Sequence, residues 1–137
     1  MSGAVFTSGN NDWNTPADFY QELDREFNFT FDPCPNDPEI EGLMIPWGES
    51  NFVNPPYTTK LQDAFANKAL IEHTKGNTVV MLVPARTSTK RFHKIFLPYA
   101  SEIRFIQGRL HFINPVTGVS PGPAPFDSML VIFNGKQ

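Results

Sequence analysis

The spacing of apolar residues predicts three helices along this chain. After Thr15-Pro16, where a threonine can cap a helix and a proline suits its first turn, apolar side chains recur at helical spacing as far as Phe27. Residues 59–74 and 87–97 follow the same spacing. We therefore predict helices over these three segments.

Short apolar runs between turn residues predict the strands. The clearest run extends from Thr78 to Val83, because it is continuous and bounded by turns, as in a strand buried on both faces. The remaining predicted strands are residues 29–31, 51–53, two strands around Gln107-Gly108 within residues 103–112, and 128–133. Residues 35–50 and 114–126 are rich in proline and glycine and are predicted to be irregular loops.

This order of elements favours an α/β fold, with a mostly parallel sheet of about five to six strands and flanking helices. The chain has no internal repeat and no linker, so residues 12–137 are predicted to form one domain after a flexible N-terminus at residues 1–11. Ligands of such sheets bind beyond the carboxyl ends of the strands. Two polar, proline-rich turns, after Phe31 and after Val53, are predicted at such ends.

Charge is distributed unevenly between the two halves of the chain. The net charge is −8 over residues 1–75 and +5 over residues 76–137, although the whole chain carries only −3. This split is compatible with a basic face that binds nucleic acid, and equally with two solvated faces that bind no partner.

Composition excludes several classes of protein. The one cysteine, Cys34, excludes an intramolecular disulfide and every multi-cysteine zinc motif, and the three histidines lack the spacing of metal ligands, so no metal is expected. The N-terminus lacks the pattern of a signal peptide. No apolar stretch approaches the roughly 18 residues of a membrane span. We expect a cytoplasmic protein that does not contact a membrane.

The run Asn54-Pro55-Pro56-Tyr57 carries the most specific chemistry in the chain. An exocyclic amine of a nucleobase is a poor nucleophile, because its lone pair is conjugated into the ring. The side-chain oxygen of Asn54 and the carbonyl of Pro55 can accept its two hydrogens and stabilise positive charge that develops on the nitrogen. The prolines hold that carbonyl in place, and Tyr57 offers a flat face on which a base can stack.

With its neighbouring motifs, this run resembles motif IV of amino-methyltransferases, and the chain from about residue 12 to residue 133 resembles the phage-type DNA N6-adenine methyltransferase family. The matching blocks are Asp12 to Pro16, Phe31 to Cys34, Trp47 with Asn51 to Tyr57, Met81 to Thr87, Gly108 to Phe112, and Ala124 to Phe126 with Ser128. The resemblance implies methyl transfer from S-adenosylmethionine to the N6 amine of adenine in double-stranded DNA. It also implies a phage or prophage protein in a bacterial host cell, with the role of protecting phage DNA from host restriction.

The resemblance assigns three groups of residues. The catalytic residues that hold the target adenine would be Asn54, Pro55, Pro56 and Tyr57. The cofactor-binding residues would be Trp13, Thr15, Pro16, Asp32, Pro33 and Cys34. The DNA-binding residues would be Arg86, Lys90, Arg91, Lys94 and Arg109.

The sequence departs from the usual methyltransferase pattern at the cofactor site. Asp32-Pro33-Cys34-Pro35 stands where many methyltransferases have a glycine-rich loop, and the interval from Cys34 to Asn51 is too short for two further strand–helix units. We therefore expect a trimmed Rossmann-like methyltransferase sheet. Its cofactor pocket would bind weakly or be completed by a second copy in a homodimer.

Other readings of the same residues stay open. Thr15 can simply cap a helix, Asp32 can close a turn, and the Asn54 to Tyr57 run can serve only as a rigid turn. Arg86 can form a surface ion pair, and the cations on the helix after it can be a solvated face. Two other functions also stay open: methylation of cytosine N4 or of RNA, and an inactive nucleic-acid-binding module of the same fold.

Overall fold

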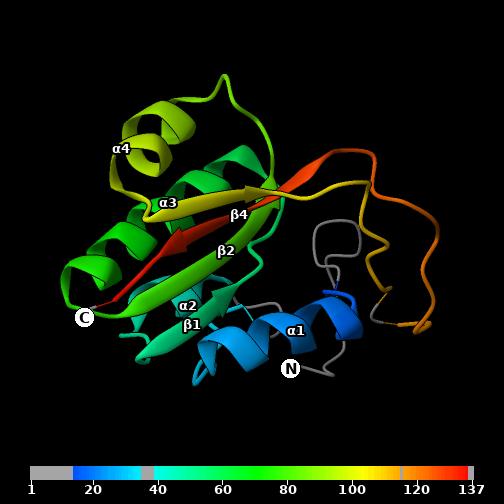
Figure 1. The fold of residues 1–137 in the computed structure, drawn as a ribbon, viewed down its shortest axis with the longest axis horizontal. Helices are drawn as coiled ribbons and strands as arrows, with labels where there is room; N and C mark the ends of the chain where they lie inside the picture. Colours follow the sequence, from blue (N-terminus) through cyan, green and yellow to red (C-terminus); the bar gives the residue numbers. More distant parts are fainter. Residues whose placement is uncertain (1–13, 35–38, 115, 136–137) are drawn as a thin grey trace.

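The computed structural model describes residues 14–34, 39–114 and 116–135, and in them a four-stranded sheet carries helices on both faces (Figure 1). The predicted flexible terminus, residues 1–11, lies outside the described residues. The strands are β1 (Ser50–Val53), β2 (Thr78–Pro84), β3 (Glu102–Phe105) and β4 (Ser128–Phe133). The helices are α1 (Ala17–Phe27), α2 (Glu39–Met44), α3 (Thr59–Thr74), the π-helix η2 (Phe92–Phe96) and α4 (Leu97–Tyr99).

The predicted mostly parallel sheet of five to six strands is wrong for the described residues, since the four strands lie in the order β1-β2-β4-β3 with only the first pair parallel. β1, β2 and β3 do run in one direction, as strands joined by helical crossovers should. β4 returns in the opposite direction and lies between β2 and β3, so both of its pairings are antiparallel. In the connection from β3 to β4, the described residues 106–114 and 116–127 hold no helix that could carry the chain back for a parallel pairing.

Two of the predicted strands do not form. Residues 29–31 lie beside β1 but make only one parallel bridge, Phe31 to Asn51, because the turn at Asp32-Pro33 ends the pairing. Beyond β3, Gly108 adopts a φ of +76°, a conformation that favours glycine, and the chain leaves the sheet there. Leu110 and Phe112 pack on the face of the sheet instead of forming a strand on its edge.

The predicted helices agree more closely with the structure than the predicted strands do. α3 coincides with the predicted segment 59–74, and Thr58 caps it by accepting a hydrogen bond from the backbone N–H of Leu61 at 3.3 Å. The predicted helix 87–97 is found from residue 90 to residue 99 and includes the π-helical turn η2. The predicted irregular loop 35–50 contains the short helix α2.

Two apolar clusters hold these layers together. On one face of the sheet, Phe65 of α3 and Phe96 of η2 pack against inward side chains of β2 and β4. On the other face, Leu23 of α1 and Phe112 pack against Phe52 of β1 and the opposite side chains of β2 and β4. The sheet is therefore covered on both faces, which explains why β1 and β4 are buried along their whole length.

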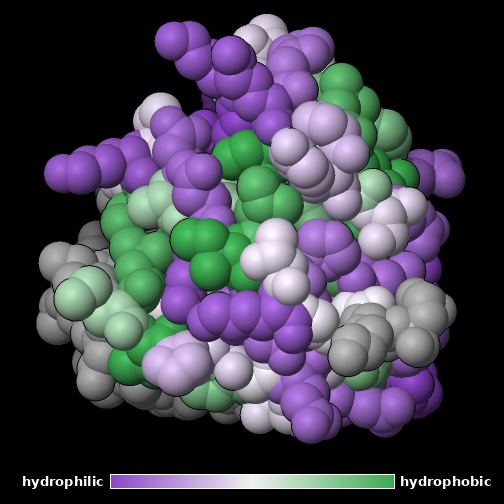
Figure 2. Space-filling model, turned by 90° about the vertical axis from the view of Figure 1, so that its left-hand side faces the viewer, coloured by the Kyte–Doolittle hydropathy of each residue, from purple (hydrophilic) through white to green (hydrophobic). Residues whose placement is uncertain are grey.

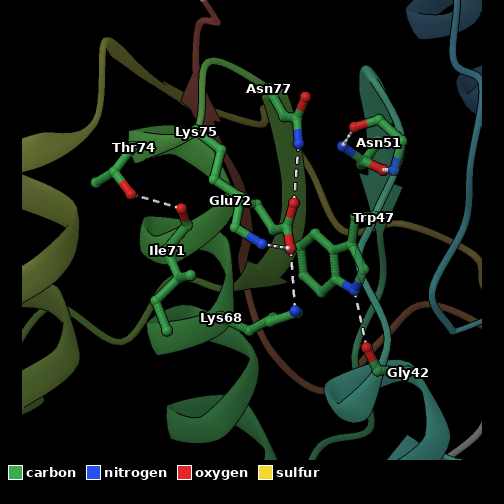
Figure 3. A network of polar contacts seen from close by, with 10 residues as sticks. Gly42, Trp47, Asn51, Lys68, Ile71, Glu72, Thr74, Lys75 and Asn77 are labelled. Carbon is green, nitrogen blue, oxygen red and sulfur yellow. Dashed lines mark hydrogen bonds and ion pairs between the residues drawn. The ribbon is translucent and has the colours of Figure 1, made fainter.

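A buried carboxylate ties α3 to two of the connecting segments (Figure 3). Glu72 has no exposed side-chain surface and forms ion pairs with Lys68 at 2.9 Å and Lys75 at 3.3 Å. Its other oxygen accepts a hydrogen bond from Asn77 at 2.9 Å, just before β2. Lys68 also lies over the ring of Trp47, which precedes β1. These contacts join the end of α3 to the segments that precede β1 and β2.

None of the helices in the described residues is long and apolar enough to cross a membrane. The long connection 106–127 lies at one end of the molecule, beyond the carboxyl ends of β1 and β2 (Figure 1). The opposite end, seen in Figure 2, has hydrophobic groups near its centre with hydrophilic groups around them. The candidate site lies at the end that carries the long connection.

Candidate active site

The run from Asn54 to Tyr57 connects β1 to α3 at the carboxyl edge of the parallel pair β1 and β2. β1 is fully buried, so the loop begins in the core, and both prolines of the run are themselves buried. A proline in the helix or strand on either side would remove a hydrogen bond, whereas in this loop it restricts φ without that loss. The predicted position of the motif, directly after a strand end, is therefore confirmed.

The side chain of Asn54 reaches the start of α1. Its Nδ2 donates a hydrogen bond to Oγ1 of Thr15 at 3.1 Å, and Thr15 is only 6% exposed. The predicted capping role of Thr15 is wrong, because Pro16 is the N-cap of α1 and the Thr15 hydroxyl is used by Asn54 instead. Two segments that the resemblance assigned to cofactor and substrate thus meet through a hydrogen bond across 39 positions of sequence.

Gln62, in the first turn of α3, contacts the same loop and was missed in the sequence. Its side chain is buried, and its Nε2 donates to the carbonyl of Pro56 at 2.9 Å and of Pro55 at 3.4 Å. The available signal was a polar residue on the buried side of a helix, between Leu61 and Phe65. That signal is weak without knowledge of what the helix packs against.

Tyr57 lies among aromatic side chains beside a cavity. Its ring meets those of Phe126 and Phe112 edge to face, with centroids 5.2 and 6.0 Å apart. The cavity, of about 260 Å³, is lined by these three rings and by residues 121–125 of the long connection. Such a site, with aromatic walls and few polar groups, suits a flat ligand.

Asp32 lies at the end of the short segment beside β1. Its Oδ1 accepts a hydrogen bond from the backbone N–H of Cys34 at 2.9 Å, so the carboxyl does close a turn. Burial raises the pKa of Asp32 to about 6, and the Cys34 hydrogen bond opposes that shift only in part. The turn is held against α2, where a Cβ on Gly42 would lie 2.2 Å from the carbonyl oxygen of Pro33. Only glycine permits this close approach.

The predicted DNA-binding cations differ in their surroundings. Arg91 is buried and donates a hydrogen bond to Asp63 of α3 at 2.8 Å, which ties the two helices together. Arg109 lies 3.5 Å from Asp127, with both side chains exposed. Across the described ranges 14–34, 39–114 and 116–135, the exposed cations Arg86, Lys90 and Lys94 form no ion pair, so the reading of Arg86 as a surface ion pair is not supported there.

The structure thus brings together Thr15, Asn54 and the two prolines of the motif through direct contacts and through Gln62. Asp32 follows Phe31, whose backbone pairs in parallel with Asn51 of β1. The chain at Asp32 therefore runs toward the carboxyl end of β1, where Asn54 lies. Trp13, the remaining cofactor candidate, lies outside the described residues.

Comparison with known proteins gives the family of the chain. Residues 4–137 match the family model described as DNA N-6-adenine-methyltransferase (Dam). A protein named DNA N-6-adenine-methyltransferase, from Haemophilus phage HP1 (strain HP1c1), is 32% identical to this chain over an alignment of 139 positions. The alignment covers 90% of the chain and 79% of the phage protein. Since the family match covers nearly the whole chain and includes the Asn54 to Tyr57 run, this protein belongs to the DNA N-6-adenine-methyltransferase (Dam) family.

Proposed function

We propose that this chain transfers the methyl group of S-adenosylmethionine to the N6 amine of adenine in double-stranded DNA, and that Asn54 and Pro55 accept the hydrogens of that amine. The family of the chain gives the reaction, methylation of adenine N6 in DNA. The observation that supports this assignment of residues is the fixed position of the Asn54 to Tyr57 loop, held from α1 by Thr15 and from α3 by Gln62.

The two acceptors would act on the adenine amine as follows. Since Nδ2 of Asn54 donates to Thr15, the other polar atom of the amide, Oδ1, is the acceptor that this mechanism assigns to the substrate amine. A carbonyl oxygen has two lone pairs, so Pro55 can accept from the substrate while it also receives the long contact from Gln62. Two fixed acceptors favour a pyramidal nitrogen and stabilise its developing positive charge. The nitrogen that has received the methyl group carries a positive charge and is therefore acidic. It loses a proton afterwards, so no strong base is needed.

The turn at Asp32 and the start of α1 are the segments proposed to bind the cofactor. S-adenosylmethionine supplies an electrophilic methyl group when it is bound. The half-buried carboxyl of Asp32 suits the ammonium group of the cofactor, because burial makes its charged form unfavourable until a cation lies beside it. We assign Thr15, Pro16, Asp32, Pro33 and Cys34 to cofactor binding on this basis.

The Asp32→Asn substitution is expected to remove a pH dependence of cofactor binding. With a pKa of about 6, Asp32 is mostly protonated at pH 5 and mostly charged at pH 7, so the affinity of the wild type should rise over this interval. The variant should bind more weakly at pH 7 and show no such rise. Calorimetric titration with S-adenosylmethionine from pH 5 to pH 8 measures both.

The same pKa also affects the stability of the protein without cofactor. A folded-state pKa above the ordinary value of about 4 means that the folded chain holds the proton more tightly, so the free energy of unfolding should fall as pH rises from about 4 to 6. Asp18→Asn, an exposed change on α1, is the matched control and should keep both trends. Identical pH profiles for wild type and Asp32→Asn would contradict the assignment.

The cavity beside Tyr57 is proposed to receive the target adenine. An adenine inside a duplex must leave the base stack before its amine is reachable, which requires roughly a few kcal/mol. Stacking against Tyr57 and its aromatic neighbours would offset part of that requirement. Tyr57, which lines the cavity, is the last residue of the Asn54 to Tyr57 run, and a base stacked there is proposed to present its amine to Asn54 and Pro55.

The DNA backbone is proposed to contact the exposed cations Arg86, Lys90 and Lys94, with a further contact from Arg109. Arg91 is not included, because it is buried and paired with Asp63. Arg86 follows the carboxyl end of β2. That end lies beside the carboxyl end of β1, which carries the Asn54 to Tyr57 run, called here the catalytic loop. Cations in this position neutralise phosphates and fix the register of the duplex without reading its sequence. Dimerisation and location in the cytoplasm of a bacterial host stay predictions.

Transfer of labelled methyl from S-adenosylmethionine to unmethylated duplex DNA, followed by digestion to nucleosides, tests the proposed function. We expect the label in N6-methyladenine. Label in N4-methylcytosine, or in RNA but not DNA, would assign a different substrate to the same site. Absence of label together with absence of cofactor binding would instead support the inactive binding module.

A further inference from the structure

The carbonyls of the catalytic loop need a second restraint besides the proline rings. Each ring fixes φ of its own residue, but the direction of each carbonyl depends on ψ, which the following proline narrows for Pro55 and which no ring restricts for Pro56. The proposed chemistry needs the Pro55 carbonyl to face the substrate amine. It also needs Tyr57, the next residue after Pro56, at a fixed place beside its cavity.

Gln62 is placed to supply that restraint. Its Nε2 lies 2.9 Å from the carbonyl oxygen of Pro56 and 3.4 Å from that of Pro55, so one amide group contacts both peptide units. Only the donor end of the amide can make these contacts, since both partners are acceptors. The orientation of the Gln62 side chain therefore follows from its surroundings.

The position of Gln62 is itself well fixed. Its backbone N–H donates to the carbonyl of Thr58 at 2.9 Å, in the capped first turn of α3. The neighbouring Phe65 and Ala66 are fully buried against the sheet. The side chain of Gln62 is 2% exposed, so water does not compete for its donor. The loop is thus attached to a helix whose apolar side is packed against the sheet.

The other end of the same amide argues against a role in stability alone. Oε1 of Gln62 is buried and has no hydrogen-bond partner among the residues that the structure describes. A buried acceptor without a partner destabilises a folded protein. The contacts of its Nε2 with the loop carbonyls give Gln62 a role that stability alone does not explain.

We propose that Gln62 is a positioning residue for methyl transfer, which fixes the carbonyls of Pro55 and Pro56 and, through them, the place of Tyr57. The proposal rests on the proposed function, because it assumes that the Pro55 carbonyl accepts from the adenine amine. Gln62 does not touch the reacting atoms in this mechanism. Its loss should therefore affect the rate of transfer much more than cofactor affinity.

Two substitutions separate the donor from the volume of the side chain. Gln62→Met keeps a similar length without donor or charge, and Gln62→Glu keeps the shape but presents oxygen to the carbonyls at neutral pH. We expect both to lower kcat, by up to about 100-fold, as a misplacement of about 1 Å does. Calorimetry should show cofactor affinity within about twofold of wild type. Asn67→Asp, an exposed amide-to-carboxylate change on the same helix, should keep wild-type kcat.

The pH profile gives the sharper test. At low pH the introduced carboxyl of Gln62→Glu is protonated and its O–H can donate to the carbonyls, so kcat relative to wild type should recover as pH falls from 8 to 5. Gln62→Met should show no recovery. All rates are measured at saturating DNA and cofactor, well below the thermal unfolding midpoint of each variant, so that loss of folding does not enter.

Wild-type kcat in Gln62→Met, or a Gln62→Glu profile that is parallel to wild type, would overturn the proposal while leaving the proposed function intact. A wild-type protein that transfers no methyl group to adenine would instead contradict the proposed function. Reduced kcat in both variants with recovery at low pH only in Gln62→Glu is the expected result.

Discussion

Asn54→Ala is expected to lower kcat for adenine methylation by about 100- to 1,000-fold, the range found when one preorganised hydrogen-bonding group is removed from an active site. The alanine has no oxygen to accept a hydrogen of the amine, so the positive charge that develops on nitrogen loses half of its stabilisation. Steady-state transfer of labelled methyl to duplex DNA, at saturating cofactor, measures the change.

The folded state of Asn54→Ala should be almost unaffected. Asn54 is only partly buried, and its side chain donates a hydrogen bond to Thr15. Loss of a single hydrogen bond of this kind changes the free energy of unfolding by about 1 kcal/mol. Asn134→Ala, at an exposed position after β4, serves as a control for both measurements. A large loss of stability with a small loss of kcat would support the rigid-turn reading of the motif.

Glu72→Ala is expected to give the largest loss of stability, about 3–5 kcal/mol at pH 7, as removal of one partner from a buried ion pair does. The substitution leaves Lys68, only 14% exposed in its side chain, without its carboxylate. It also releases Asn77 ahead of β2 (Figure 3). Urea denaturation followed by circular dichroism measures the difference.

The matched control for Glu72→Ala is Glu22→Ala. Glu22 lies 3.8 Å from Arg25 with both side chains largely exposed, and exposed pairs contribute about 0–1 kcal/mol. An equal change in the two variants would show that the buried cluster around Glu72 carries no special stability.

Stability should also depend on pH through Glu72. Burial alone would raise the pKa of this carboxyl, but the hydrogen bonds from Lys68 and Asn77 and the charge of Lys68 outweigh burial and lower the pKa. A lowered folded-state pKa stabilises the protein fully above the unfolded-state value of about 4.3 and less as pH falls through the folded-state value. The difference between wild type and Glu72→Ala should therefore shrink below about pH 4.

Local signals predicted the elements that depend mainly on their own residues. α3 has a capping threonine and a run of apolar positions on one side, and β2 is a continuous apolar run between turns, so both were found at their observed places. The segment 29–31 and the chain after Gly108 carry equally apolar residues, yet they do not form strands. Residues 29–31 reach β1 but are limited to one bridge by the turn at Asp32-Pro33, and the chain after Gly108 packs on the face of the sheet.

The candidate site divides in the same way. The Asn54 to Tyr57 run, its place after a buried strand and its chemistry were predictable, because a loop with two prolines has few alternatives. Gln62 was not predictable, since nothing in α3 indicates which of its polar residues faces a loop. Arg91 was grouped with solvent-facing cations, but it is buried beside Asp63, 28 positions away.

The sequence by itself therefore determined the local elements, the reactive motif and the family, because periodicity, turn residues and motif spacing are properties of neighbouring positions. Only the tertiary structure decided that β4 lies antiparallel between β2 and β3, that Thr15 accepts from Asn54, and that Gln62 holds the prolines. The first two depend on which distant segments meet in space, and the third depends on which side of α3 packs against the sheet. That meeting is set by the burial of two apolar clusters on the two faces of one sheet, which no short stretch of the chain encodes.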